Sequence, residues 1–209
     1  MLVIALCKGR LLDPSLELLN RAAIRFDDDV SLSRKLIFES TDRRYRAILV
    51  KPADVPTYVE YGAADIGIAG RDVLLESHAD VLQPLDLGFG YCKIAVAGPK
   101  GEQSINGSGH PTVRVATKYP RITMDHFNSR GIPVEIIPLS GSIELAPLIG
   151  LADRIVDVVE TGRTLKENGL EILEVIAETT ARLMLNRAGY QTKREEVLAF
   201  IEALENARR

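Results

Sequence analysis

The sequence is poor in the residues that carry thiol, imidazole and indole chemistry. It has no tryptophan, two cysteines and three histidines in 209 residues. His78, His110 and His126 are scattered with no ligand spacing, which argues against a histidine-based metal site. Cys7 and Cys92 stand alone in apolar surroundings, so we expect buried thiols in a reducing compartment rather than a disulfide.

Long apolar runs and an excess of positive charge are also missing. No run approaches the roughly 20 apolar residues of a membrane-spanning helix. The formal net charge is -3, which argues against general nucleic-acid binding. Residues 1–7 enter a strand-like run with no basic segment or cleavage site, so we expect no export signal and a cytoplasmic location.

A strand, a glycine turn and a short helix are the main features of residues 154–170. β-Branched residues fill positions 155–159, which predicts a buried strand. Glu160-Thr161-Gly162 then forms a turn signal, and residues 164–168 read as a short helix that Gly169 ends. A strand that leads through glycine into a helix presents unpaired backbone N–H groups, which favour a phosphate.

The side chains of this segment suit a phosphorylated sugar. Thr161 and Thr164 add hydroxyl donors, Arg163 adds a cation, and Asp157 can accept hydrogen bonds from sugar hydroxyls. The alternative is an ordinary strand–turn–helix connection with threonine caps, and the segment alone leaves both interpretations open.

Cationic residues follow other predicted strands. Residues 2–7 predict a buried strand that Lys8 and Arg10 follow, and residues 47–50 predict another that Lys51 follows. Ligands bind α/β sheets at this carboxyl edge, although solvated loops are the alternative. Further strands are expected at 36–38, 65–69, 81–87, 91–97, 112–117, 134–137 and 173–184, and helices at 13–26, 54–61, 120–130, 140–151 and 192–204. Short strand–helix–strand spacing predicts βαβ units and parallel sheets.

Several longer motifs occur in one order along nearly the whole chain. They read I-A-L-C-K-G-R at 4–10, Y-V-E-Y-G-A-A-D-I-G-I-A-G-R-D at 58–72, A-T-K-Y-P at 116–120, G-S-I-E-L-A-P-L-I-G-L-A-D-R-I-V-D at 141–157 and T-G-R-T-L-K-E-N-G-L at 161–170. With these motifs the chain resembles the ATP phosphoribosyltransferase family, in its short form. A T-G-x-T-L motif alone would be weaker, because type I phosphoribosyltransferases carry a similar loop.

The resemblance implies an α/β fold of two domains of the periplasmic-binding-protein type (class II-like), with an interdomain cleft. We expect residues 1–88 plus 178–209 in the first domain and residues 89–177 in the second, which carries the phosphoribosyl pyrophosphate loop. The implied reaction condenses ATP with phosphoribosyl pyrophosphate to N1-(5-phosphoribosyl)-ATP and pyrophosphate, with Mg²⁺, as the first step of histidine biosynthesis.

The resemblance also assigns site residues. Lys8, Arg34 and Lys51 are the expected catalytic residues, although many family members have arginine where Lys51 stands. Substrate binding falls to Arg10, Asp157, Glu160, Thr161, Gly162, Arg163, Thr164 and Leu165, with Asp157 on the ribose and the 161–165 turn around the 5′-phosphate. Glu144 and Asp153 are weaker candidates for metal or ribose contacts, with helix capping and solvation as the alternative.

Partners follow from the same resemblance. Short-form chains work with a regulatory subunit similar to histidyl-tRNA synthetase, so we expect a homodimer that assembles with it into a hetero-octamer. The competing interpretations are a type I phosphoribosyltransferase acting on a free base and a non-catalytic solute-binding protein.

Overall fold

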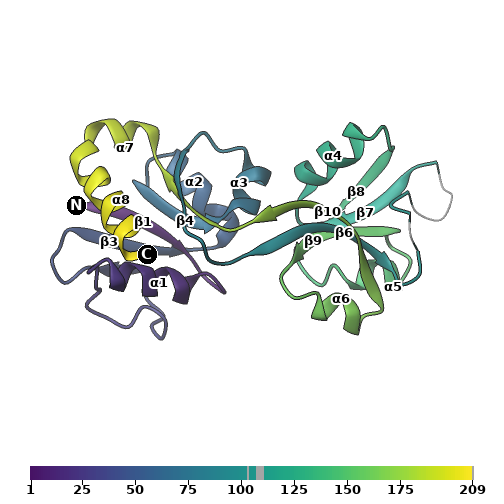
Figure 1. Ribbon diagram of the computed structural model, residues 1–209, viewed down its shortest axis with the longest axis horizontal. Helices are drawn as coiled ribbons and strands as arrows, with labels where there is room; N and C mark the ends of the chain where they lie inside the picture. Colours follow the sequence, from purple (N-terminus) through teal and green to yellow (C-terminus); the bar gives the residue numbers. More distant parts are fainter. Residues whose placement is uncertain (103, 107–110, 209) are drawn as a thin grey trace. The chain divides into compact units, whose positions relative to one another are not determined.

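The computed structural model describes residues 1–102, 104–106 and 111–208. The chain forms two compact units, one made of Met1–Gly90 with Thr180–Arg209 and the other of Tyr91–Thr179 (Figure 1). Both divisions fall two residues beyond those expected from the sequence. His110 lies outside the described residues.

The first unit is built on a six-stranded sheet in the order β2-β3-β1-β4-β11-β5. Its strands are β1 (Leu2–Cys7), β2 (Ile37–Glu39), β3 (Tyr45–Val50), β4 (Ile66–Gly70), β5 (Leu82–Asp86) and β11 (Ala181–Leu185). β1 pairs in parallel with β3 and β4, whereas β2 is antiparallel to β3, and β11 is antiparallel to β4 and β5. The nearly continuous apolar sequence of β1 fits its central, buried position.

Helices cover the sheet of the first unit. They are α1 (Leu12–Arg21), the 3₁₀ turn η1 (Pro52–Asp54), α2 (Val55–Glu60), α3 (Arg71–Ser77), α7 (Arg187–Thr192) and α8 (Arg194–Arg208). α8 packs on α1, and α2 packs on β4 and β1. One buried apolar cluster joins these helices to the sheet, with Leu19 and Phe200 fully enclosed.

The second unit has a five-stranded sheet in the order β10-β6-β9-β7-β8. Its elements are β6 (Cys92–Pro99), β7 (Val113–Thr117), α4 (Pro120–Ser129), β8 (Val134–Pro138), α5 (Leu145–Leu148), β9 (Arg154–Val159), α6 (Arg163–Glu167) and β10 (Leu170–Thr179). β7 pairs in parallel with β8 and β9, and β6 runs antiparallel to β9 and β10. Within this unit α4 lies on one side of the sheet, and α5 and α6 lie on the other (Figure 1).

The sheets are mixed rather than parallel, which corrects the expectation from short strand–helix spacing. β2 and β3 pair in antiparallel with no helix between them. β10 runs almost directly into β11, with only Thr180 between them, and each of the two strands is antiparallel to its neighbours in its own sheet. These two strands occupy the segment where one strand was expected, at 173–184. Both cysteines are buried thiols, as predicted, and the Cys92 Sγ lies 2.9 Å from the Thr179 hydroxyl.

Three helix predictions were wrong in detail. The helix expected over 13–26 is α1, which already ends at Arg21, and the Asp13 carboxylate in its first turn accepts a hydrogen bond from the Ser31 hydroxyl at 2.8 Å. The helix expected over 140–151 is reduced to the single turn of α5. The helix expected over 192–204 is α8, which begins at Arg194, whereas Thr192 ends the preceding helix α7 and its hydroxyl donates to the Ala188 carbonyl.

Candidate active site

The strand, glycine turn and short helix of residues 154–169 form as predicted. Gly162 has φ of 73°, a left-handed conformation that glycine adopts at little cost. Leu165 is 6% exposed and belongs to the same buried cluster as Ile155 and Val159, so it anchors α6 against β9. We call residues 160–165 the elbow; the side chains of Glu160, Thr161, Arg163 and Thr164 are exposed there.

The elbow offers hydrogen-bond donors to an anion. The first amides of a helix have no carbonyl one turn earlier to bond. The Thr161 hydroxyl oxygen accepts from the Arg163 amide at 3.4 Å, and the Gly162 carbonyl accepts from the Lys166 amide at 3.1 Å. Arg163 also lies 3.5 Å from Glu167, but both side chains are largely exposed, so this pair is weak.

Asp157 lies on β9, two residues before that strand ends. Side chains alternate between faces along a strand, so Asp157 shares its face with Ile155 and Val159. It is half-buried, and its Oδ1 accepts a hydrogen bond from the Val158 amide at 2.8 Å. A carboxylate in this position stands next to the elbow and can accept from hydroxyl groups of a ligand bound there.

The loops after β7 and β8 meet β9 at the same edge as the elbow. The Thr117 hydroxyl donates to the Val156 carbonyl at 2.7 Å and accepts from the Tyr119 amide at 2.8 Å. The Leu139 amide donates to the Thr117 carbonyl at 3.0 Å. Sequence reasoning used the A-T-K-Y-P stretch only as a family motif and missed this role of Thr117. The signal was a threonine at the end of a predicted strand.

The two weaker candidates, Glu144 and Asp153, lie at different edges of this sheet. Glu144 is half-buried and precedes α5 on the connection from the carboxyl end of β8. Asp153 precedes the start of β9, at the edge opposite the elbow, where its oxygens accept from the Arg114 amide at 2.9 Å and guanidinium at 3.0 Å. Asp153 therefore links the starts of β7 and β9, and this position argues against a part for Asp153 in the candidate active site.

The expected cations of the first unit gather at one edge of its own sheet. β1 and β3 are parallel with Cys7 beside Val50, so Lys8 and Lys51 leave neighbouring strand ends. The Lys8 amide donates to the Val50 carbonyl at 2.9 Å, which holds this register. Arg10 follows two residues after Lys8. All three side chains are exposed.

Arg34 approaches the same edge from another direction. β2 is antiparallel to β3, and the Leu49 amide donates to the Leu36 carbonyl at 2.9 Å, so the segment before β2 passes the carboxyl end of β3. Arg34 is exposed on that segment. Four positive charges thus collect where parallel strands present ligand sites.

Other arginines of this region form ion pairs with acidic side chains. Arg43 pairs with Asp27 at 3.1 Å and Glu39 at 2.7 Å, and Arg46 pairs with Glu39 at 2.8 Å. These hydrogen bonds lower the pKa of Glu39. They leave the Arg43 and Arg46 charges partly neutralised by neighbours.

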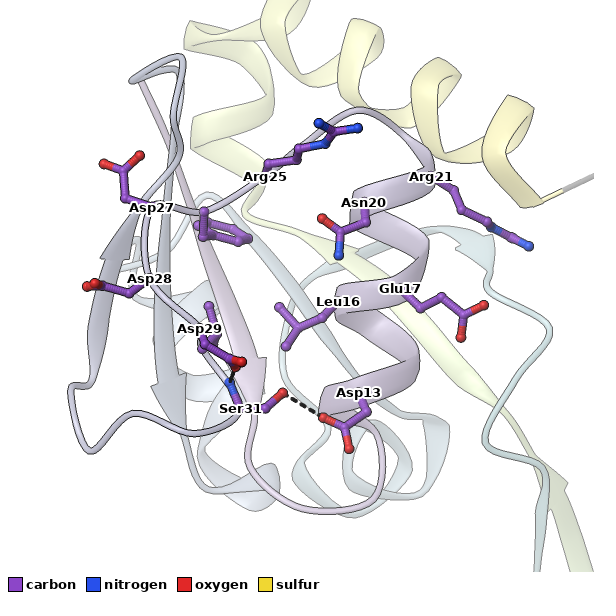
Figure 2. A pocket seen from close by; sticks show the side chains of 12 residues that line it. Asp13, Leu16, Glu17, Asn20, Arg21, Arg25, Asp27, Asp28, Asp29 and Ser31 are labelled. Carbon is purple, nitrogen blue, oxygen red and sulfur yellow. Dashed lines mark hydrogen bonds between the residues drawn. The ribbon is translucent and has the colours of Figure 1, made fainter.

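A groove of about 760 Å³ between α1 and residues 25–31 is a poor site for an anionic substrate (Figure 2). Its charged lining consists of Asp13, Glu17, Asp27, Asp28 and Asp29 with Arg21 and Arg25. Carboxylates therefore outnumber guanidinium groups there, and like charges repel a polyphosphate.

The thiol near the cationic edge is not a nucleophile. Burial raises the pKa of Cys7 to about 11, and Asp72 adds to the rise while Arg10 opposes it. Cys7 is therefore protonated at neutral pH, and a protonated thiol reacts poorly.

Metal binding by protein side chains alone is not supported in the part of the chain that the structure describes, since no group of three or more histidine, cysteine, aspartate or glutamate residues could hold an ion there. Among the same residues no helix is long and apolar enough to span a membrane.

Comparisons with known proteins agree with one family. A sequence model described as HisG: ATP phosphoribosyltransferase matches residues 51–206. An ATP phosphoribosyltransferase of Geobacter metallireducens is 51% identical over 98% of this chain and 97% of its own length. One from Acidithiobacillus ferrooxidans is 50% identical over 98% and 96%.

Solved structures show the same relationship. A chain of the ATP phosphoribosyl transferase (HisG:HisZ) complex from Thermotoga maritima aligns with a TM-score of 0.87 at 41% identity, over 100% of this chain and 98% of its own. The periplasmic aliphatic sulphonate binding protein SsuA from Escherichia coli aligns with a TM-score of 0.63 at 12% identity, over 99% and 68%, which shows the fold alone. The fold is therefore the two-domain periplasmic-binding-protein type, and this chain belongs to the ATP phosphoribosyltransferase family.

Proposed function

We propose that this chain transfers the phosphoribosyl group of phosphoribosyl pyrophosphate to N1 of the adenine of ATP. The products are N1-(5-phosphoribosyl)-ATP and pyrophosphate, and the reaction is the first step of histidine biosynthesis. The observation that carries the proposal is the 51% identity to a named ATP phosphoribosyltransferase over 98% of the chain.

The sugar phosphate binds at the elbow. Amides and hydroxyls of residues 161–165 surround the 5′-phosphate, with Arg163 as the cation. Asp157 accepts from the ribose hydroxyls, and Glu160 contacts the sugar beside it. The exposed hydroxyls of Thr161 and Thr164 and the fixed turn at Gly162 support this assignment.

The cationic residues of the first unit act on the anionic groups of the substrates. Loss of pyrophosphate from the anomeric carbon develops negative charge on the leaving group and an oxocarbenium-like sugar, as in glycosyl transfer. Lys8, Arg34 and Lys51 neutralise charge of this kind, and Arg10 adds to substrate binding. The adenine N1 has its own lone pair, so no strong general base is needed, consistent with the protonated thiol at Cys7.

Mg²⁺ enters with the substrate. It would supply further neutralisation of the negative charge that develops on the leaving pyrophosphate. One of the carboxylates Asp157, Glu160 and Glu144 would hold it, directly or through water, which suits the one or two carboxylates by which Mg²⁺ is usually bound.

The chain works in the cytoplasm with a regulatory partner. Its Thermotoga maritima neighbour is a HisG:HisZ complex, and this supports a regulatory subunit similar to histidyl-tRNA synthetase. The assembly is a homodimer of this chain within a hetero-octamer.

The test is product formation from ATP, phosphoribosyl pyrophosphate and Mg²⁺, followed by mass spectrometry, with and without the partner subunit. Phosphoribosyl-ATP is expected. Use of free adenine in place of ATP, or binding of both substrates without turnover even with the partner, would contradict the proposal.

A further inference from the structure

We propose that the Thr117 hydroxyl is a positioning group for the sugar substrate. It holds the peptide that leads into Asp157, and through it the carboxylate that contacts the ribose. The inference rests on the proposed function, because it takes phosphoribosyl pyrophosphate as the ligand of the elbow.

The contacts of Thr117 connect two loops to one strand. Its side chain is fully buried. The hydroxyl donates to the Val156 carbonyl at 2.7 Å, and that carbonyl belongs to the peptide bond whose nitrogen is that of Asp157. The same oxygen accepts from the Tyr119 amide at 2.8 Å and lies 3.3 Å from the Thr123 hydroxyl.

The position of Thr117 at the end of a strand explains why a side chain is needed there. Thr117 and Val156 are the last pair at which β7 and β9 align. Beyond this pair β7 ends, whereas β9 continues to Val159 and stays paired on its other side with β6, where Asp157 lies opposite Ala95. Strand pairing therefore no longer ties Asp157 to β7. The hydroxyl extends the connection by one bond at that point.

Loss of the hydroxyl would leave two buried backbone groups without this partner, namely the Val156 carbonyl and the Tyr119 amide. Buried polar groups seek other partners because leaving them unpaired is costly. A small rotation of the Val156–Asp157 peptide within the pairing of β9 with β6 is the available response, and it moves the carboxylate. Misplacement by a fraction of an ångström is enough to weaken a positioned contact.

A purely stabilising role is the competing explanation, and three variants of the full-length chain separate the two. Thr117→Val keeps the shape and removes the hydroxyl, whereas Thr117→Ser keeps the hydroxyl. Arg114→Gln breaks the partly buried pair with Asp153 at the opposite edge of the same sheet, and so loosens this unit away from the elbow. Calorimetry gives the Kd for phosphoribosyl pyrophosphate with Mg²⁺ and for ATP, and thermal unfolding gives Tm.

We expect Thr117→Val to raise the Kd for phosphoribosyl pyrophosphate about tenfold, with the Kd for ATP changed less than about twofold. Thr117→Ser restores binding, and Arg114→Gln lowers Tm without changing the Kd for the sugar substrate. An unchanged Kd in Thr117→Val, an equal loss of ATP binding, or an equal effect of Arg114→Gln would overturn the inference alone. A wild-type chain that fails to bind phosphoribosyl pyrophosphate would overturn the proposed function with it.

Discussion

At the scale of single residues, the cationic edge of the first unit is organised by strand register. Lys8 and Lys51 leave parallel neighbours, and the Lys8 amide bond to the Val50 carbonyl fixes their spacing. Between them and the core lies Cys7, whose raised pKa of about 11 keeps the thiol uncharged. The positive charge of this edge is therefore not offset by a thiolate.

Lys51 follows β3 at the cationic edge, and a matched pair of variants tests its expected role. We expect Lys51→Met to lower kcat/KM for phosphoribosyl pyrophosphate by about 10- to 100-fold, the range for loss of a charged hydrogen bond. Lys51→Arg keeps the charge and restores the two-pronged donor, so it should retain activity within a few-fold. Steady-state kinetics of the holoenzyme measures both. Full activity in Lys51→Met would exclude a catalytic role.

At the scale of elements, the elbow depends on a backbone conformation that side chains disfavour. Gly162 has φ of 73°, and an added Cβ would meet only the Val159 side chain, at 3.8 Å. The penalty for alanine is thus conformational rather than a clash. Gly141 has no positive φ and nothing within 4 Å of an added Cβ, so it is a matched control on a neighbouring loop.

We expect Gly162→Ala to lower the free energy of unfolding by about 1–2 kcal/mol, because a left-handed conformation costs that much in L-residues. Gly141→Ala should change it by less than about 0.5 kcal/mol. Urea denaturation followed by circular dichroism gives both values. Equal stability of the two variants would mean that the turn relaxes to a conformation that alanine accepts, and that the elbow is not held rigidly.

Local patterns predicted the elements that single residues determine, and failed where distant contacts decide. The β-branched run at 155–159 and the glycine after it define a strand and turn by themselves, and both form as expected. The direction of β6, β10 and β11 depends on which strand each one meets, which periodicity does not encode. The break between α7 and α8 is likewise tertiary, because Lys193 donates to Asp65, 128 residues earlier in the chain.

The same contrast between local patterns and distant contacts holds for the residues of the candidate site. The motifs placed Asp157 and the elbow on one connection, and parallel register explains why Lys8 and Lys51 are neighbours. Asp153 was a weaker candidate for metal or ribose contacts, and the sequence did not reveal its bond to Arg114 because that partner lies 39 residues away in the chain. Thr117 was missed for the same reason, since its partner Val156 is equally distant in sequence.

At the scale of the whole molecule, two units with separate cores share one chain, so each carries its own sensitivity to pH. In the second unit His126 of α4 lies against β10, with Nε2 3.7 Å from a Glu174 oxygen and a side chain only 8% exposed. Burial lowers the pKa of His126 below its ordinary 6.5, and the nearby Arg130 charge lowers it further, while Glu174 opposes both.

The lowered pKa of His126 makes the second unit less stable in mild acid. The folded chain binds a proton at His126 less readily than the unfolded chain does. The contribution of neutral His126 to the free energy of unfolding is therefore fully present above about pH 6.5 and is lost as the pH falls below that value. The urea midpoint should therefore decrease between pH 7.5 and pH 5. In His126→Gln this decrease should be smaller, because no proton is taken up at that position on unfolding. His78→Gln replaces an exposed histidine of the first unit and should keep the wild-type slope. If His126→Gln follows the wild type across this range, another group controls the response, and the neutral form of His126 contributes nothing to the stability of the sheet that carries the elbow.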